Sequence, residues 1–458
     1  MKIKKLLFIT LLFICSPSAN SQERNLTVGP MFTDHAILQQ GQPIPIWGKA
    51  RKGATVTVKF GKVKTKTKAD SKGNWKIMLP AQQASFNGQT LTVCSGKDLI
   101  TLNDVVVGEI WVAAGQSNME YTMRLHKTFQ KPYKGKDLAA EELEKPTNER
   151  IRIFNCPRKG KNNGWRHAGG ETLAMASAPG YFCVKHLQDS LGVPVGIIST
   201  AVGGTVIDSW QEHGNWYEKM IAPYVPYAVR GILWYQGENN CARRERSYAS
   251  KFKKMTAQWR TRWNVADMPF LTVMLAPHIY SNRKHRNGTT VDAEELPAFR
   301  MQQMACLDSV ANTEIIFNPD LVDDLLDIHH SYKWEVGRRM AVMALNRIYG
   351  RKELEWSGPR AISATATENG AVIVKFIHAD GGLTVPESKM IRWFEVADSN
   401  GIWHSANAEL TDSQTVRISS YRTDKPVAVR YLWHETAVST DLCNKSGLCA
   451  LPFKLTVE

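Results

Sequence analysis

Ser117 is the residue around which the sequence concentrates its reactive groups. Residues 108–123 read GEIWVAAGQSNMEYTM, so an apolar stretch typical of a strand ends at a glycine and the serine follows two positions later. A serine hydroxyl becomes an effective nucleophile when a neighbouring base removes its proton. A serine followed by asparagine after a strand is also common where a helix begins. The turn alone therefore does not distinguish catalysis from helix capping.

A base for this serine is available near residue 330. Residues 323–341 read DDLLDIHHSYKWEVGRRMA, in which Asp327, His329 and His330 precede an amphipathic helical pattern. A carboxylate beside an imidazole fixes its tautomer and stabilises the imidazolium that forms during acyl transfer. The alternative is a solvent-facing histidine pair beside aspartates that cap the helix.

Two further strand ends offer donors for an oxyanion. The stretch IISTAVGGTVIDSW contains Gly203 and Gly204, whose backbone N–H groups can be approached without a Cβ in the way. The stretch ILWYQGENN carries side-chain amides at Gln236 and Asn239. Each is compatible with an ordinary turn. Three polar turns after buried strands, together with the Asp/His pair, favour an acyl-transfer site.

The elements that must position these residues form an α/β pattern over residues 103–352. Apolar runs such as 105–114 and 229–235 lack alternation, which is typical of buried parallel strands. Helical periodicity occupies 247–263 and 331–350 between or after such runs. The pattern predicts a doubly wound parallel sheet. In such sheets ligands gather at the carboxyl ends of the strands, where the polar turns lie.

Small all-β sandwich modules are predicted on both sides of this region, over residues 22–102 and 353–458. Both stretches contain short segments of strand-like residues separated by glycine-containing turns, for example ATVTVKF and NWKIMLP in the first. The predicted order is therefore a β module, an α/β hydrolase domain and a second β module.

Residues 1–21 are predicted to be a secretory signal. A lysine-rich start precedes an apolar run at 6–14, and small residues precede a cut before Gln22. The bulky Ile14 before Cys15 makes lipid attachment the less favoured alternative. We therefore expect an exported protein, periplasmic or secreted, without a membrane span.

The composition of the 458 residues is that of an ordinary folded protein, with 43% hydrophobic and 22% charged residues. The formal charge of +15 includes lysines of the signal and is compatible with acidic glycans or with a solvated basic surface. No stretch resembles a nucleic-acid-binding module. Cys443 and Cys449 lie in one loop, CNKSGLC, where an exporting compartment would permit a disulfide.

The motifs together resemble the sialate O-acetylesterase family, which belongs to the wider SGNH hydrolases. The resemblance rests on GEIWVAAGQSNME, GGTVIDSW, MIAPYVPYAVRGILWYQGENN and DIHHSYKWEVGRRMA. It extends to MFTDHAILQQGQPIPIWGKA near the N-terminus and KPVAVRYLW near the C-terminus. Nearly the whole chain after the signal is covered, with the motifs in the family's order.

The resemblance implies that Ser117 is the nucleophile, His329 the general base and Asp327 the carboxylate that orients the histidine. The family usually has proline after this histidine, whereas this chain has His330. Asp327 and His330 also make the Asp-x-x-His spacing common in SGNH enzymes. His330 therefore stays open as a rival base, and Asp324 as a second orienting carboxylate.

The resemblance also implies an oxyanion hole built from the backbone N–H of the nucleophile, Gly204 and an amide of the Q-G-E-N block. Gln236 is the favoured amide and Asn239 the second. Trp210 and Trp234 are expected as sugar-stacking surfaces, with core packing as the alternative.

The predicted function is that of a serine esterase acting on an O-acetylated carbohydrate, either sialic acid or a plant-type glycan. The route is an acetyl-enzyme intermediate, which requires no metal or organic cofactor. The alternatives are a lipid or aryl esterase of the same fold and a non-catalytic, exported glycan-binding protein. The sequence predicts no nucleic-acid partner and leaves the oligomeric state open.

Overall fold

The structure is a computed structural model in which the described residues are 25–125, 132, 135–160, 163–282, 290–385, 390–438 and 441–458. The predicted signal, residues 1–21, lies outside them.

A mixed sheet at the centre of the molecule confirms the predicted parallel strands. Its strands, in order across the sheet, are β10 (Arg166–Ala168), β9 (Asn148–Asn155), β11 (Val195–Ala201), β8 (Asp98–Gly115), β12 (Gly231–Tyr235), β13 (Phe270–Val273) and β14 (Thr313–Ile316). Neighbouring strands from β9 to β14 run parallel, whereas β10 is antiparallel at the edge. The carboxyl ends of these parallel strands therefore meet at one edge of the sheet.

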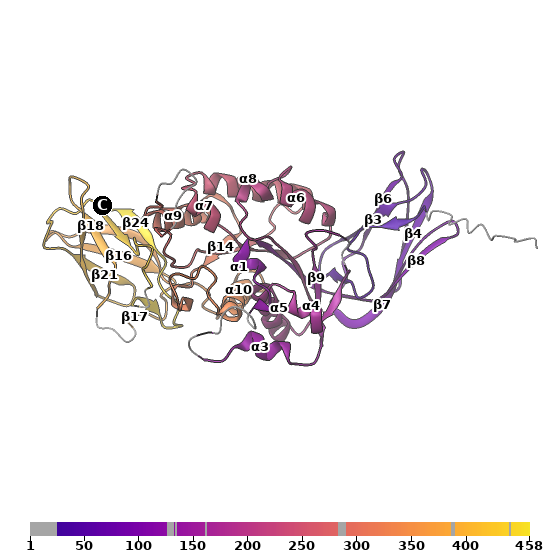
Figure 1. The fold of residues 1–458 in the computed structure, drawn as a ribbon, viewed down its shortest axis with the longest axis horizontal. Coiled ribbons are helices and arrows are strands. Elements are labelled where there is room, and N and C mark those ends of the chain that lie inside the picture. Colours follow the sequence, from indigo (N-terminus) through magenta and orange to yellow (C-terminus); the bar gives the residue numbers. More distant parts are fainter. Residues whose placement is uncertain are drawn as a thin grey trace, which may run out of the picture.

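Helices cover both faces of this sheet (Figure 1). One group contains α8 (Tyr248–Trp263) and α9 (Glu295–Ser309), which pack against each other. The other contains α5 (Ala178–Leu191) and α10 (Lys333–Arg347), which also pack together. The shorter helices are α1 (Ser117–Glu120), α3 (Leu138–Leu143), α4 (Gly170–Ala174), α6 (Asn215–Met220) and α7 (Glu238–Ala242).

The long strand β8 changes character along its length. Its first part, residues 98–104, alternates between exposed and more buried positions, whereas residues 105–115 are all buried. Alternation is typical of an antiparallel strand with one wet face, and continuous burial is typical of a central parallel strand. The two patterns correspond to two pairings, because β8 pairs antiparallel with β7 (Ser85–Ser95) and then parallel with β11 and β12.

The N-terminal strands are attached to the central sheet through β8. One three-stranded sheet has the order β1-β3-β6, while β2, β4, β5 and β7 connect to β8 directly or through one another. Their bounds are β1 (Thr27–Val28), β2 (Ile37–Gln39), β3 (Ile44–Lys49), β4 (Thr55–Phe60), β5 (Val63–Lys68) and β6 (Asn74–Leu79). One buried cluster runs from Leu26 to Trp356. The predicted boundary after residue 102 therefore falls inside a continuous strand.

The C-terminal strands form two four-stranded antiparallel sheets around a second buried cluster, to which Met274, Ile315 and Phe317 of the α/β region also contribute. The first sheet has the order β15 (Arg360–Ala366), β16 (Val372–Ile377), β21 (Thr415–Ser419), β20 (Asn407–Leu410). The second has the order β19 (Trp403–Ser405), β18 (Phe394–Ala397), β22 (Ala428–Tyr431), β24 (Phe453–Thr456). A two-stranded sheet joins β17 (Leu383–Thr384) to β23 (Cys443–Asn444). The Sγ atoms of Cys443 and Cys449 lie 3.6 Å apart.

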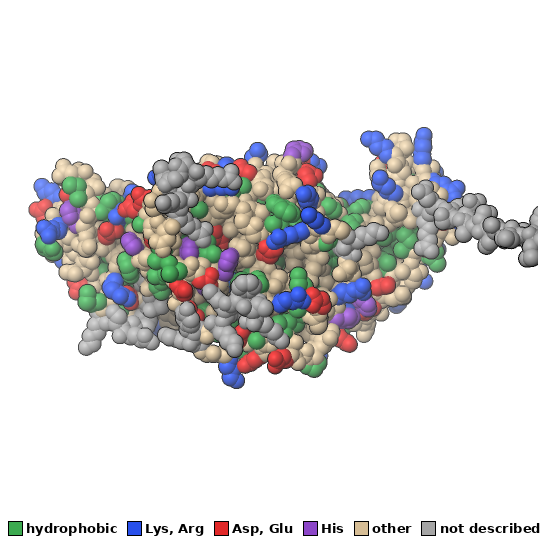
Figure 2. Space-filling model, viewed as in Figure 1, with side chains coloured by type: hydrophobic (Ala, Val, Ile, Leu, Met, Phe, Trp, Pro, Cys, Tyr) green, Lys and Arg blue, Asp and Glu red, His purple; other side chains and the backbone are tan. Residues whose placement is uncertain are grey.

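Basic side chains gather at the end of the molecule that the N-terminal strands form (Figure 2). Strand β5 presents Lys64, Lys66 and Lys68 to solvent, alternating with half-buried residues. Among the described residues, no helix combines the length and apolarity that a membrane crossing requires.

Candidate active site

Ser117 lies immediately beyond the carboxyl end of β8, at the first position of α1. The chain turns at Gly115, which has φ +136°, and a Cβ on this residue would lie 2.1 Å from the carbonyl oxygen of Tyr235. Only glycine combines this backbone conformation with so close an approach of the neighbouring strand. The serine hydroxyl group is consequently placed at the edge where the parallel strands end.

A pocket of about 500 Å³ brings Ser117 together with the predicted histidine loop. Its lining residues are Ser117, Glu120, Tyr121, Thr122, Leu125, Asp327 and His329. The Tyr121 and His329 rings lie 6.5 Å apart between their centres. The pocket therefore contains a hydroxyl group, an imidazole and a carboxylate from two distant parts of the chain.

Asp327 contacts the backbone of the histidine loop. Its Oδ1 accepts a hydrogen bond from the backbone N–H of His329 at 2.9 Å. Asp324 acts one turn earlier, since its Oδ1 accepts from the N–H of Leu326 at 2.8 Å. The two aspartates thus fix the conformation of the loop that carries the imidazole.

His330 lies away from the pocket. Its side chain is 3% exposed, and the pocket is lined by His329 instead. Burial, assisted by the nearby Lys333 and His329, holds the pKa of His330 well below its usual value. The geometry consequently favours His329 as the residue that meets Ser117, and His330 as a neutral buried side chain.

The glycine pair lies beside the serine turn. A Cβ on Gly203 would lie 3.4 Å from the Cβ of Ser117. The N–H of Gly203 donates to Oε2 of Glu120 at 2.7 Å. Gly204 is exposed with φ +71°, and within the described part of the chain its N–H donates no hydrogen bond. Gly204 is therefore the member of the pair whose donor can face a ligand.

The structure corrects the expectation for Gln236. This side chain is fully buried, and its Nε2 donates to Gln116 Oε1, the Thr205 carbonyl and Asn240 Oδ1 at 3.0, 3.1 and 2.8 Å. An amide nitrogen has only two hydrogens. Since protein acceptors already occupy them, Gln236 braces the turn and does not supply an oxyanion donor.

The side-chain amide of Asn239 makes fewer hydrogen bonds with other described residues than that of Gln236. Its Nδ2 donates to the carbonyl of Gly204 at 2.5 Å, which uses one of its two hydrogens. Its backbone N–H points at Oε1 of Gln116 at 3.4 Å. Asn239 is half-buried, so its second N–H can face the same space as Gly204.

Trp210 and Trp234 are not sugar-stacking surfaces. They are 0% and 2% exposed, and their rings pack edge to face with centres 6.1 Å apart. Their indole N–H groups donate to Thr205 Oγ1 and to the hydroxyl of Tyr248. Because both rings are enclosed, the structure supports the core-packing alternative for these residues.

The comparison with known families decides the identity of the chain. A model of carbohydrate esterases, described as sialic acid-specific acetylesterases, matches residues 107–346. The chain belongs to this carbohydrate esterase family. The matched region contains Ser117, Asp327 and His329.

Similarity to individual proteins extends over most of the esterase. Human sialate O-acetylesterase is 24% identical over 466 residues, which covers 85% of this chain and 83% of the human protein. The mouse sialate O-acetylesterase is 22% identical over 498 residues, covering 88% of each chain. The crystal structure of a carbohydrate acetylesterase from Xanthomonas citri superposes with a TM-score of 0.83 at 29% identity, covering 94% of this chain and 99% of that one.

A second cavity of about 540 Å³ adjoins the serine pocket of the esterase. Glu120 and Thr122 line both cavities. The second cavity is also lined by polar and basic side chains, among them Asn155, Arg158 and Arg166. Such side chains suit hydroxyl and carboxylate groups of a ligand.

A buried polar group behind the serine pocket was not anticipated from the sequence. Asn118, Glu238 and Lys333 are 2%, 3% and 0% exposed and are joined by hydrogen bonds. Tyr121 in the pocket wall was also missed. Burial, followed by the Asp327 and Asp137 carboxylates, raises the pKa of the Tyr121 hydroxyl to about 12, so it stays protonated at neutral pH.

The sequence signals for these residues were weak. Asn118 stands in the quoted GQSNM block and Glu238 in the QGENN block, but neither block shows which side chains turn inward. Lys333 lies at the start of an amphipathic helix, where a lysine is normally exposed.

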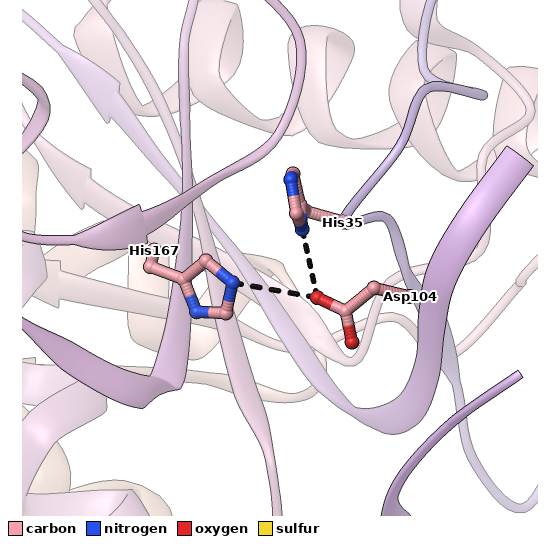
Figure 3. Close-up of side chains that lie close together, drawn as sticks. All are labelled: His35, Asp104 and His167. Atoms are coloured by element: carbon pink, nitrogen blue, oxygen red, sulfur yellow. Dashed lines mark hydrogen bonds and ion pairs between the residues drawn. The ribbon is translucent and has the colours of Figure 1, made fainter.

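One side-chain cluster in the described residues has the composition of a metal site. His35, Asp104 and His167 converge from the turn before β2, from β8 and from β10 (Figure 3). Their ligand atoms meet at Oδ2 of Asp104, 2.7 Å from His35 Nδ1 and 3.3 Å from His167 Nε2. However, the guanidinium of Arg152 lies 2.9 Å from the same oxygen and contacts the His167 ring. Since Arg152 already supplies the positive charge, we interpret the cluster as an ion-paired junction between strands.

Proposed function

We propose that this carbohydrate esterase is a serine hydrolase with an SGNH-type fold, and that it removes O-acetyl groups from carbohydrate through an acetyl-enzyme intermediate. The observation that carries the proposal is the shared pocket of Ser117, Asp327 and His329. Family membership supports the substrate class, and the placement of the serine at the carboxyl edge of the parallel sheet supports the site.

In the first step His329 takes the proton of Ser117 Oγ as the oxygen bonds to the acetyl carbonyl carbon. The carbonyl oxygen becomes an oxyanion. When the tetrahedral intermediate collapses, the bond to the sugar oxygen breaks and the imidazolium returns its proton to that oxygen. Asp327 keeps the loop of His329 in place and stabilises the transient positive charge.

In the second step a water molecule attacks the acetyl-enzyme. His329 accepts a proton from the water; as the second tetrahedral intermediate collapses, the bond between the acetyl carbon and Ser117 Oγ breaks, the imidazolium returns its proton to that oxygen, and acetate is released. The backbone N–H groups of Ser117 and Gly204 and the second N–H of Asn239 are the proposed oxyanion donors. A donor of this kind contributes on the order of 3 kcal/mol to the transition state.

The sugar is proposed to occupy the adjoining cavity while its acetyl group reaches Ser117. Arg158 and Arg166 line that cavity, and Arg158 forms an ion pair with Glu120, which leaves Arg166 as the more accessible cation. An exposed guanidinium matches the carboxylate of a sialic acid. We therefore place acetylated sialic acid before neutral plant glycans among the candidate substrates.

Export and a separate C-terminal module remain part of the proposal. The predicted signal supports export to the periplasm or the medium. The second buried cluster, most of whose residues lie beyond α10, supports a C-terminal β module.

The test of the mechanism replaces Ser117 with alanine. The matched control replaces Ser250, an exposed serine on α8, with alanine. We expect Ser117→Ala to abolish acetate release above background, while Ser250→Ala keeps the wild-type rate. Acid quenching of the wild-type enzyme during turnover of a nitrophenyl acetate should trap an acetyl group on the peptide that contains Ser117. Wild-type rates in Ser117→Ala would contradict the proposal.

The test of the substrate compares O-acetylated sialosides with acetylated xylan. Arg166→Gln should raise KM for the sialoside about tenfold and leave the xylan unaffected, since only the sialoside has a carboxylate to pair. Arg51→Gln, at an exposed turn of the N-terminal region, is the control. Equal effects of Arg166→Gln on both substrates would exclude carboxylate recognition by this residue.

A further inference from the structure

The side chain of Asn118 lies between the two segments that carry the reacting groups. It follows Ser117 directly and is 2% exposed. Its Nδ2 donates to the carbonyl oxygen of Ile328 at 3.1 Å, and Ile328 stands between Asp327 and His329. One buried amide therefore joins the serine turn to the histidine loop, although the two contacts are 210 residues apart in the chain.

Two charged residues hold this amide in one orientation. Nδ2 of Asn118 also donates to Oε1 of Glu238 at 2.5 Å, at the start of α7. Oδ1 of Asn118 accepts from Nζ of Lys333 at 2.7 Å, at the start of α10. Because one side of the amide faces an acceptor and the other a donor, a flipped amide would lose these hydrogen bonds.

Lys333 is enclosed on every side. Its Nζ lies over the rings of Tyr121 and Tyr235, 5.2 and 5.9 Å from their centres. The titratable groups that face it are Glu238 from α7, Asp327 and His330 from the loop, Tyr121 after α1 and Tyr235 from β12. Burial lowers the pKa of Lys333 to about 7 against the opposing effect of Glu238 and Asp327, and burial raises the pKa of Glu238.

A buried set of a carboxylate, an amide and an amine, as in Glu238, Asn118 and Lys333, is an energetically unfavourable way to fill a protein interior. Isolated buried ions lose their hydration, and well-packed apolar residues of similar volume are often at least as stable. The buried carboxylate, amide and ammonium lie directly behind the pocket and contact both of its reacting segments. Local departures of this kind from the most stable packing are characteristic of functional sites.

We propose that Asn118, Glu238 and Lys333 form a positioning clamp, which fixes the serine turn against the histidine loop and thereby sets the approach of His329 to Ser117. The clamp residues act through Ser117 and His329 and do not themselves touch the substrate. This inference rests on the proposed serine mechanism and assigns to it three residues outside the pocket.

The clamp makes a specific kinetic prediction. Loosening it should lower kcat and leave KM nearly unchanged, because the substrate cavity is not altered whereas the alignment of the reacting atoms is. A displacement of about 1 Å in such a site lowers the rate about 10²-fold. A purely structural role would instead reduce the folded fraction and leave kcat per folded molecule intact.

The experiment measures kcat, KM and thermal unfolding for Asn118→Ala, Lys333→Met and Glu238→Gln in the full chain. We expect kcat to fall about 10²-fold in Asn118→Ala and Lys333→Met, with KM within about twofold of wild type. Glu238→Gln is the conservative variant. Its side-chain oxygen can still accept from Asn118, so its kcat should stay within about tenfold of wild type.

Two matched controls replace residues of the same type outside the site. Lys251→Met removes a partly exposed lysine that pairs with Asp208 and Glu245 on the surface. Glu109→Gln removes a buried carboxylate that pairs with Arg230 in the first part of the central sheet. Both are expected to keep the wild-type kcat per folded molecule, whatever their effect on stability.

The pH profile gives a second readout. Removing a buried cation close to the histidine loop makes protonation of the nearby imidazole easier. The acid limb of kcat/KM should therefore move to higher pH in Lys333→Met, by at least about half a pH unit, and stay in place in Lys251→Met.

The proposal is overturned if Asn118→Ala and Lys333→Met keep kcat within twofold of wild type and leave the acid limb unmoved. If either variant does not fold, Asn118→Ser decides the same question by the same criteria, with a fall in kcat expected, and Glu238→Gln remains the conservative comparison. Ser117→Ala is measured alongside: activity retained in this variant refutes the serine mechanism itself, whereas activity lost in Ser117→Ala but retained in the clamp variants refutes only the clamp.

Discussion

Replacing each of the two adjacent histidines in turn tests the proposed assignment of the general base. His329→Asn removes an imidazole from the pocket that contains Ser117, and His330→Asn removes one that is 3% exposed and outside that pocket. Asparagine keeps a polar side chain of smaller size at both positions. The pair of variants therefore differs chiefly in whether the lost imidazole can reach Ser117, the proposed nucleophile.

The expected magnitudes follow from these placements. A general base contributes up to about 10⁴-fold to the rate, which corresponds to about 5.4 kcal/mol of transition-state stabilisation. His329→Asn should lose most of this. His330→Asn should keep kcat within about threefold and lose about 1–2 kcal/mol of unfolding free energy, since it leaves buried space unfilled.

The pH dependence of stability separates the two histidines further. Burial keeps the pKa of His330 well below its usual value, so the folded protein leaves this imidazole neutral. The unfolded chain binds a proton there below about pH 6.5. Unfolding free energy is therefore lost as the pH falls below about 6.5, and His330→Asn should remove this part of the acid sensitivity.

The assay combines acetate release from an acetylated sialoside with denaturant unfolding between pH 5 and 8. A large loss of activity in His330→Asn with wild-type turnover in His329→Asn would refute our assignment and favour the Asp-x-x-His spacing. Equal losses in both, with equal stability, would show that the imidazoles act as a pair.

Three further predictions concern the surroundings of the site. Gly115→Ala should lose about 3 kcal/mol of unfolding free energy or fail to fold, because the added methyl group would lie 2.1 Å from a carbonyl oxygen of β12; unchanged denaturant midpoints would contradict this. Glu120→Ala should lower kcat about tenfold through loss of the acceptor for the Gly203 N–H, with Glu120→Gln closer to wild type. Cys443 and Cys449 should form a disulfide under oxidising conditions, so thiol titration of the denatured protein should fall by two and recover on reduction; an unchanged titre would exclude the bond.

Much of the framework could be predicted because the informative residues lie along single strands. The continuous apolar run at 105–114 indicated a central parallel strand, and the structure has β8 there with complete burial. The polar turn after this run placed Ser117 at the carboxyl edge of the sheet, where it lies. Both inferences depend on local pattern alone.

The direction of side chains within the turns could not be predicted in the same way. Gln236 and Asn239 occupy one short turn, yet the amide of Gln236 is consumed by buried acceptors while Asn239 stays half-exposed. Trp210 and Trp234 follow or end strands that approach the site, but both rings point into the core. These outcomes depend on contacts between segments far apart in the sequence.

Lys333 shows the limit most clearly. In an amphipathic pattern it reads as a solvated residue at a helix start, whereas its ammonium group is enclosed by two tyrosines and bonded to Asn118. The predicted boundary after residue 102 raises a related point, because it lies inside β8. The change from alternating to continuous burial within β8 resembles the junction of two modules, but the strand continues through it.

The continuity of β8 has a mechanical consequence for the esterase. A strand of 18 residues extends at most roughly 60 Å, and its last residue lies two positions before Ser117. With hydrogen-bonded neighbours along its flanks, this continuous strand couples the N-terminal sheets directly to the edge where Ser117 lies. A fragment beginning at residue 103 would therefore start mid-strand, with bare edges prone to aggregation.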